Sequence, residues 1–143
     1  MTATTVPLAA NAVAQCRVNF GNSAGTDRRI ELRLRDDGSN SLVSARILLN
    51  DNTLNIWRRD AGAITALAAV SGLGMTDSTD YWLRFAAIGS RLEAWTSTNG
   101  TSWTSRAVVS ETTYMSQRGF SIRLVDNVAN PTITVDDLLV WTP

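Results

Sequence analysis

The sequence contains no histidine and no lysine, and its only cysteine is Cys16. Histidine is the most common general base in enzymes, so neither a Ser-His-Asp nor a Cys-His arrangement can be built from this chain. Zinc and copper sites lose their usual ligand, and a single cysteine excludes both an internal disulfide and a cysteine-based zinc site. We therefore expect Cys16 to pack as a small hydrophobic side chain.

An excess of charge of either sign is also missing, because 13 basic residues, all arginine, are balanced by 13 acids. The chain thus lacks the basic footprint of a nucleic-acid-binding protein, and we expect no nucleic-acid partner. Its apolar runs are too short to cross a membrane, and its start lacks the basic and apolar regions of a secretory signal. We expect a protein that stays inside the cell, leaves by lysis or forms one piece of a longer chain.

The clearest pattern in the chain is a period-two alternation of apolar and polar residues, in short segments separated by Gly, Asn, Asp and Ser. The expected strands are 12–20, 28–35, 42–49, 54–59, 63–70, 81–88, 91–97, 103–109, 119–125 and 132–141. The Ala-rich segment 63–70 also suits a helical turn. This pattern predicts an all-β fold, a two-sheet antiparallel β-sandwich, as a single domain over 1–143 in which residues 1–11 form an N-terminal arm or first strand.

The stretch YWLRFAAIGSRLEAW, residues 81–95, has the pattern of a β-hairpin that turns at Gly89 and Ser90. Counting outward from this turn pairs Arg84 with Trp95 and places Trp82 on the same side of the sheet. The odd-numbered positions 81–87 carry Tyr, Leu, Phe and Ala, so they form the expected core side. The hairpin therefore has large aromatic residues on both faces.

The order YWLRFAAIGSRLEAW, STNGTSWT, GFSIRL and TITVDDLLVW resembles the C-terminal half of bacterial and phage concanavalin A-like lectin/glucanase (laminin G-like) domains. The earlier IELRLRDDGSNSLVSARILL is similar to their arginine-bearing strand followed by a long hairpin, so the resemblance covers 12–141. It implies a jelly-roll sandwich with one curved sheet and with carbohydrate bound on the concave face or at its rim. Only residues 2–8 remain to serve as the usual first strand, which leaves a sheet edge short of a partner.

The acids do not form the pattern of a glucanase of this fold, which alternates two catalytic carboxylates along one strand. The only glutamates are Glu31, Glu93 and Glu111, and none lies in such an alternation. Asp136 and Asp137 are adjacent, so we expect their side chains on opposite sides of a strand. We therefore predict that the protein is not an enzyme.

We expect no cofactor, although calcium is the one metal that the composition permits. The loops at 36–40, 50–52 and 126–127 carry hard oxygen ligands, but none has the spacing of an EF-hand. The same residues are common makers of turns, which is the alternative explanation.

The candidate binding surface consists of Trp82, Arg84 and Trp95, which we expect Arg33 and Trp57 to extend. Sugar rings stack on aromatic faces, and arginine offers a planar fork of donors to hydroxyls or carboxylates. Two other interpretations remain open, because the same residues suit a subunit interface or a plain cover of the sheet held by a cation–π contact.

Two functions follow as hypotheses. The first is a non-catalytic, lectin-like module that attaches a phage appendage or a secreted bacterial protein to cell-surface polysaccharide. The alternative is a structural virion protein, for capsid decoration or a minor tail position, whose sandwich mediates protein–protein assembly. The expected partners are therefore cell-surface polysaccharide or other virion proteins, with a homo-oligomer as a further option, and the expected location is the virion or the extracellular space.

Overall fold

The computed structural model describes residues 10–128 and 131–143, which form ten β-strands. The strands are β1 Ala12–Asn19, β2 Arg29–Leu34, β3 Leu42–Leu48, β4 Thr53–Asp60, β5 Ala63–Ser71, β6 Asp80–Ile88, β7 Arg91–Ser97, β8 Thr104–Ser110, β9 Phe120–Val125 and β10 Thr134–Trp141. Each expected strand is confirmed to within a few residues, including the ambiguous segment 63–70. The first strand expected at residues 2–8 lies outside the described residues.

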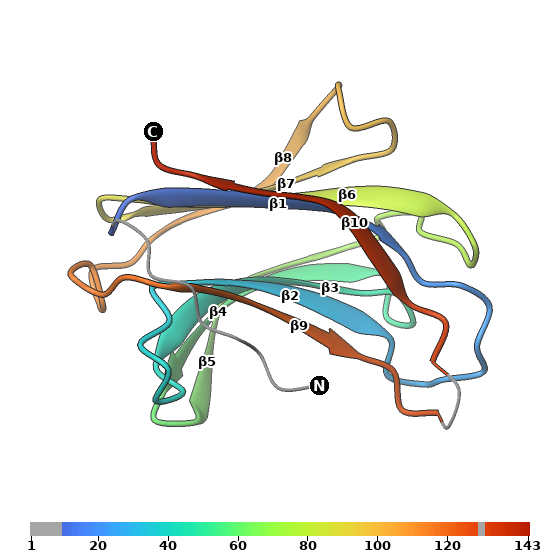
Figure 1. Ribbon diagram of the computed structural model, residues 1–143, viewed down its shortest axis with the longest axis horizontal. Helices are drawn as coiled ribbons and strands as arrows, with labels where there is room; N and C mark the ends of the chain where they lie inside the picture. Colours follow the sequence, from blue (N-terminus) through green and yellow to red (C-terminus); the bar gives the residue numbers. More distant parts are fainter. Residues whose placement is uncertain (1–9, 129–130) are drawn as a thin grey trace.

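The strands form two layers that lie face to face (Figure 1). One five-stranded sheet has the order β10-β1-β6-β7-β8, and the other has the order β5-β4-β3-β2-β9. All neighbours are antiparallel. This is the two-sheet antiparallel jelly-roll sandwich that the sequence predicted. In the described part of the chain, no helix has the length and apolar character needed to cross a membrane.

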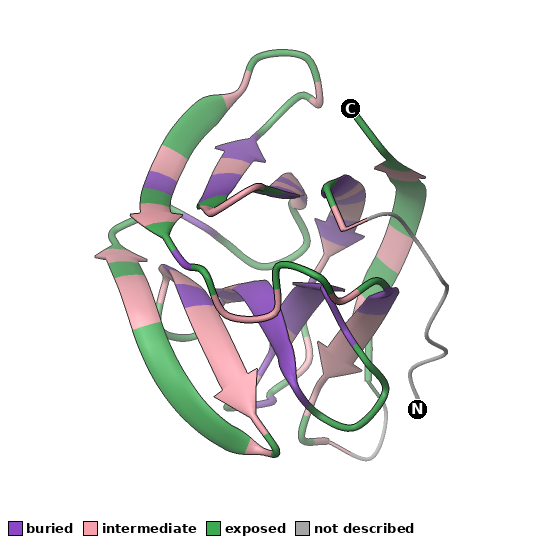
Figure 2. Cartoon of the chain, turned by 90° about the vertical axis from the view of Figure 1, so that its left-hand side faces the viewer, coloured by how far each residue is buried: buried purple, intermediate pink, exposed green. Residues whose placement is uncertain are grey.

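The core lies between the two sheets. It consists of every second residue along the strands, whose side chains point inward from both layers. β1 contributes Ala14, Cys16 and Val18, all fully buried, and β2 contributes Ile30 and Leu32 from the opposite layer. Figure 2 shows this burial along the central strands, whereas the edge strands β5, β8 and β10 are largely exposed. Each large apolar side chain that is fully removed from water contributes about 1.5–3 kcal/mol, so the central strands stabilise the sandwich most.

The β6–β7 hairpin has the register that the sequence predicted. Arg84 pairs with Trp95 and Trp82 pairs with Ser97, and Gly89 adopts the positive φ of 53° that the turn requires. Leu83 and Phe85 are fully buried, so the odd-numbered positions form the dry side. The large side chains at the even positions therefore point outward from the sheet.

A β-bulge in the β1–β10 pair contradicts the expected placement of Asp136 and Asp137. The register shifts between Gln15 and Arg17, and Asp137 adopts a positive φ of 51°. The extra residue cancels the alternation, so both aspartates reach Arg17, at 3.0 and 3.4 Å. The prediction that their side chains point to opposite sides was wrong.

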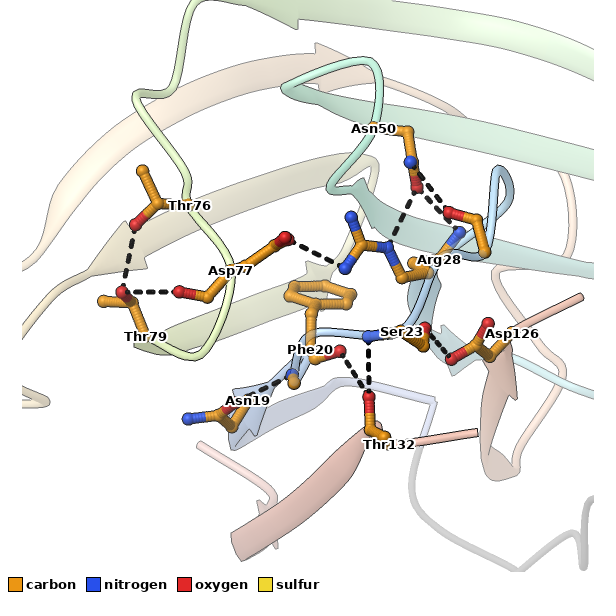
Figure 3. Close-up of polar contacts among 12 residues, drawn as sticks. Asn19, Phe20, Ser23, Arg28, Asn50, Thr76, Asp77, Thr79, Asp126 and Thr132 are labelled. Carbon is orange, nitrogen blue, oxygen red and sulfur yellow. Dashed lines mark hydrogen bonds and ion pairs between the residues drawn. The ribbon is translucent and has the colours of Figure 1, made fainter. Parts of the chain in front are cut away.

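The loops at one end of the sandwich hold each other through side-chain hydrogen bonds (Figure 3). The Ser23 hydroxyl donates to Asp126 at 2.7 Å, and the Arg28 backbone N–H donates to Asn50 at 3.1 Å. Arg28 also forms an ion pair of 2.7 Å with Asp77, in the loop before β6. Loops from both halves of the chain are thereby fixed to one another.

Candidate functional site

The structure divides the five predicted site residues between two opposite faces. Trp82, Arg84 and Trp95 lie on the outer side of the β10-β1-β6-β7-β8 sheet. Arg33 and Trp57 lie on the outer side of the other sheet, where they share a rung with Ser44 of β3. Outward residues of two facing layers point away from each other, so the expected extension of the surface by Arg33 and Trp57 is wrong.

Two further tryptophans join the first surface, which we call the aromatic face: Trp82, Arg84, Trp95, Trp103 and Trp141. The Arg84 guanidinium carbon lies 3.9 Å from the ring centre of Trp103 and 5.7 Å from that of Trp141. Sequence reasoning missed both residues. Trp141 has the same odd parity as Val135, which pairs with the buried Val18, so alternation alone would place it on the core side; only the bulge in β10 turns it outward. Trp103 belongs to the β7–β8 loop, where no alternation applies.

Arg84 is already engaged by its neighbours on the aromatic face. Its Nε and Nη2 donate to the side-chain oxygen of Gln15 at 3.0 and 2.7 Å. It forms no ion pair among the described residues, and burial lowers the pKa of its guanidinium. The donor fork that the sequence suggested for a ligand is therefore occupied by Gln15, and the tryptophan rings are the main surface left for recognition.

Exposed apolar side chains extend the aromatic face. Ile88, Val108 and Leu139 point to the same side of the sheet and are 41%, 47% and 55% exposed. Scattered exposed apolar residues are normal, but a group of them beside several tryptophans is typical of a binding surface.

The opposite face carries a cluster of arginines around one glutamate. Arg33 donates twice to Glu31, at 2.8 and 3.0 Å, and Arg46 lies 4.2 Å above the ring of Trp57. Arg46 and Arg59 form no ion pair among the described residues, and burial lowers the pKa of both. The buried nitrogens Arg46 Nε and Trp57 Nε1 have no hydrogen-bond partner there. This face offers positive charge and unused donors, which suits an oxygen of an anionic group.

A hollow of about 300 Å³ opens between the sheets, beside the β7–β8 loop. Hydroxyl groups of Thr96, Thr98, Ser102 and Thr104 line it together with Arg106. Sequence reasoning missed this hollow, because the run TSTNGTSWT reads as turn residues and gives no sign of an enclosed space.

The acids near β10 form ion pairs rather than the carboxylate pair of a glycosidase. Arg17 contacts Asp80, Asp136 and Asp137 at distances between 3.0 and 3.4 Å. A glycosidase of the usual kind needs one carboxyl held protonated beside a second, ionised one. One arginine bridges all three aspartates, so this cluster is a salt-bridge network that joins β1, β6 and β10 and suits a structural role.

The loop oxygens proposed as calcium ligands accept hydrogen bonds from the chain itself. Asp37 accepts from the backbone N–H of Ser39 at 2.8 Å, and Asp126 accepts from Ser23 at 2.7 Å. Among the described residues, no group of three or more His, Cys, Asp or Glu side chains is placed to hold a metal ion. The turn-forming interpretation therefore has direct support in these contacts.

Comparison with known proteins shows similarity of fold alone. No protein family matches the sequence, and no curated protein does. The carbohydrate-binding module CBM66 from Bacillus subtilis superimposes with a TM-score of 0.74 at 10% identity, over 96% of this chain and 76% of that one. Sheep galectin-11, in complex with glycerol, gives 0.69 at 8% identity, over 98% and 96%. A mutant of the GH43 protein BlXynB from Bacillus licheniformis gives 0.70 at 10% identity, over 93% of this chain but only 28% of that one.

Proposed function

We propose that this protein is a non-catalytic carbohydrate-binding module and that the aromatic face is its binding surface. The observation that carries the proposal is the concentration of Trp82, Trp95, Trp103 and Trp141 on one outward face. Sugars present flat arrays of C–H groups that stack on indole rings, and stacking requires exposed aromatic surface on a rigid sheet. The similarity in fold to a carbohydrate-binding module and a galectin supports the same class of ligand.

The proposed mechanism is recognition without chemistry. Arg84, held between Trp103 and Trp141 and bonded to Gln15, positions the indole rings rather than the ligand. Because this scaffold is formed before a ligand arrives, little conformational entropy is lost on binding. The three-acid cluster around Arg17 supports the absence of hydrolysis, and no cofactor is required.

Titration calorimetry against a panel of soluble polysaccharides tests the proposal. We expect at least one saccharide to bind in the millimolar range or tighter, and Trp95→Ala to weaken that binding about fivefold or more, as one to a few kcal/mol of lost contact implies. Trp57→Ala, on the opposite face, is the matched control and should leave this affinity unchanged. The same titration with a chelator tests calcium, and we expect no change.

Failure of every saccharide to bind at millimolar concentration, or an equal loss from Trp57→Ala, would contradict the proposal. Release of reducing sugar during the titration would contradict its non-catalytic part.

A second candidate function is assembly with other proteins, as a virion component or a homo-oligomer. The exposed Ile88, Val108 and Leu139 beside the tryptophans favour it, since interface centres combine aromatic and apolar residues. Mass measurement in solution separates the two, because assembly through this face predicts a larger species that Leu139→Asp dissociates.

We further propose that the module attaches a phage appendage or a secreted bacterial protein to cell-surface polysaccharide. The support is the resemblance of the sequence to bacterial and phage concanavalin A-like domains. Binding of the purified protein to bacterial cells, and its competition by the soluble saccharide found above, tests this role.

A further inference from the structure

The hollow beside the β7–β8 loop has two chemically different walls. Ile47, Leu73 and Met75, from the β5-β4-β3-β2-β9 sheet and the loop after β5, form the apolar wall. The hydroxyls on the other wall belong to β7, β8 and the loop between them. A sugar ring has this same division, with C–H groups on its faces and hydroxyls at its edge. The volume of about 300 Å³ is at the lower limit of ligand pockets, so it suits one ring rather than a chain.

Three of the seven polar side chains that line the hollow are not used by the protein, whereas Tyr81 and Ser97 already form hydrogen bonds within the chain. Among the described residues, the hydroxyls of Thr98, Ser102 and Thr104 form no hydrogen bond. Thr96 accepts from Arg106 Nε at 2.7 Å, which leaves its own hydroxyl proton free to donate. The wall is therefore ready to exchange hydrogen bonds with ligand hydroxyls.

A β-bulge directs Arg106 into the hollow. The register of β7 and β8 shifts between Ala94 and Trp95, so that Trp95 pairs with Ser105 and Ala94 with Ala107. Arg106 is the extra residue, and it lines the hollow beside Thr96. Bulges are enriched next to functional sites because they redirect single side chains.

Within residues 10–128 and 131–143, Arg106 is the only charged residue that lines the hollow, and no aspartate or glutamate lines it. Arg106 also forms no ion pair among the described residues, so its guanidinium retains the Nη donors for a ligand. A half-buried guanidinium without a carboxylate partner favours an anionic ligand.

We propose that this hollow is a second binding site, distinct from the aromatic face, and that it takes a single sugar ring bearing a carboxylate, such as a hexuronic acid unit. The ring lies between the apolar wall and the hydroxyl wall, and its carboxylate accepts hydrogen bonds from Arg106. This site does not depend on binding at the aromatic face.

The experiment compares methyl glucuronide with methyl glucoside, which differ in the carboxylate, by NMR of protein carrying ¹³C-methyl methionine. Met75 lines the hollow and Met115 is exposed elsewhere, so the two signals separate a specific response from a general one. We expect the glucuronide to shift the Met75 signal in a saturable way and to bind about tenfold more tightly than the glucoside, as one charge-assisted hydrogen bond allows. Higher salt should reduce this preference.

Arg106→Gln should abolish the preference for the glucuronide, whereas Arg118→Gln, the same change at an exposed loop position, should keep it. Thr104→Val, which removes one exposed hydroxyl, provides a second variant that leaves the Arg106–Thr96 bond in place and should weaken both ligands. Equal affinity for the two ligands, an unmoved Met75, or an equal effect of Arg118→Gln would overturn the proposal. Loss of polysaccharide binding at the aromatic face would leave this test unaffected, so the two proposals fail separately.

Discussion

At the scale of single residues, the alternation of side chains decides which tryptophans can meet a ligand. Leu83 and Phe85 are fully buried and their neighbours Trp82 and Arg84 point outward, as the sequence predicted from period two alone. The partners of Arg84 could not be predicted in this way. Gln15 lies 69 positions away along the chain, and only the pairing of β1 with β6 brings the two side chains together.

Replacement of Phe85 by alanine tests the inward assignment. We expect Phe85→Ala to lower the free energy of unfolding by about 3–5 kcal/mol, because it leaves a cavity in a fully buried site. Trp95→Ala, on the outward side of the paired strand, should cost clearly less. Denaturant unfolding measures both, and a larger loss for Trp95 would reverse the assignment of faces.

Cys16 offers a second measurement at this scale. Burial raises the pKa of its thiol to about 12, so about one thiol in 10,000 is ionised at pH 8. We expect a thiol reagent to modify the native protein only through unfolding and to modify the denatured protein within minutes. Rapid modification under native conditions would show that the core around β1 is open.

At the scale of elements, the sequence predicted strands and the β6–β7 turn well, because alternation and a Gly-containing turn are local signals. The bulges were not predictable, since one extra residue in a strand leaves the sequence pattern almost unchanged. One such bulge explains why the predicted sides of Asp136 and Asp137 were wrong. A second explains why the Arg106 side chain points into the hollow.

The β7–β8 loop supports the aromatic face through Gly100. A Cβ at this position would lie 2.9 Å from Nε1 of Trp82, and the residue has a positive φ of 74°. We expect Gly100→Ala to cost about 1–2 kcal/mol in backbone strain and to displace the Trp82 indole as well. Gly72→Ala, with a φ of 72° and open space around it, should show the strain without any change in tryptophan fluorescence. Identical fluorescence in both variants would contradict this contact.

The contact between β4 and the β8–β9 loop makes the free energy of unfolding depend on pH in the acid range. Hydrogen bonds from Tyr114 and then Arg58 lower the pKa of Asp60 below its ordinary 3.8. Burial alone would raise the pKa of Glu111, but bonds from Thr113 and Arg58 bring it below 4.5. Groups with a lowered pKa stabilise the fold above their unfolded value, so this contribution is complete above about pH 5. It begins to fall near the unfolded values of 4.5 and 3.8 and is lost as the pH falls through the lower pKa values of the folded state.

Thermal unfolding at a series of pH values between about 3 and 7 measures that loss. The melting temperature should fall less steeply in Glu111→Gln than in the parent protein, because the variant no longer titrates at this position. Parallel curves for the two proteins would show that the contact carries no pH dependence.

At the scale of the whole molecule, the fold was predictable and the composition of the site only in part. Ten short alternating strands in a chain of this length leave few alternatives to a sandwich. Nothing local reveals which of the two sheets a strand joins, so Arg33 and Trp57 were placed beside Trp82 although they lie on the opposite side. Trp103 reaches Arg84 from a loop, and the hollow beside that loop exists only once both sheets are assembled.

The most direct measurement of the central claim is the set of indole N–H signals in the ¹⁵N–¹H NMR spectrum, during titration with the saccharide that calorimetry finds to bind. The chain has 5 tryptophans, of which Trp57 alone lies on the opposite face and so serves as an internal reference. We predict that the signals of Trp82, Trp95, Trp103 and Trp141 shift together with one affinity while that of Trp57 stays in place. A titration that moves only Trp57, or that leaves all the indoles unmoved while the saccharide binds, would contradict carbohydrate recognition by the aromatic face.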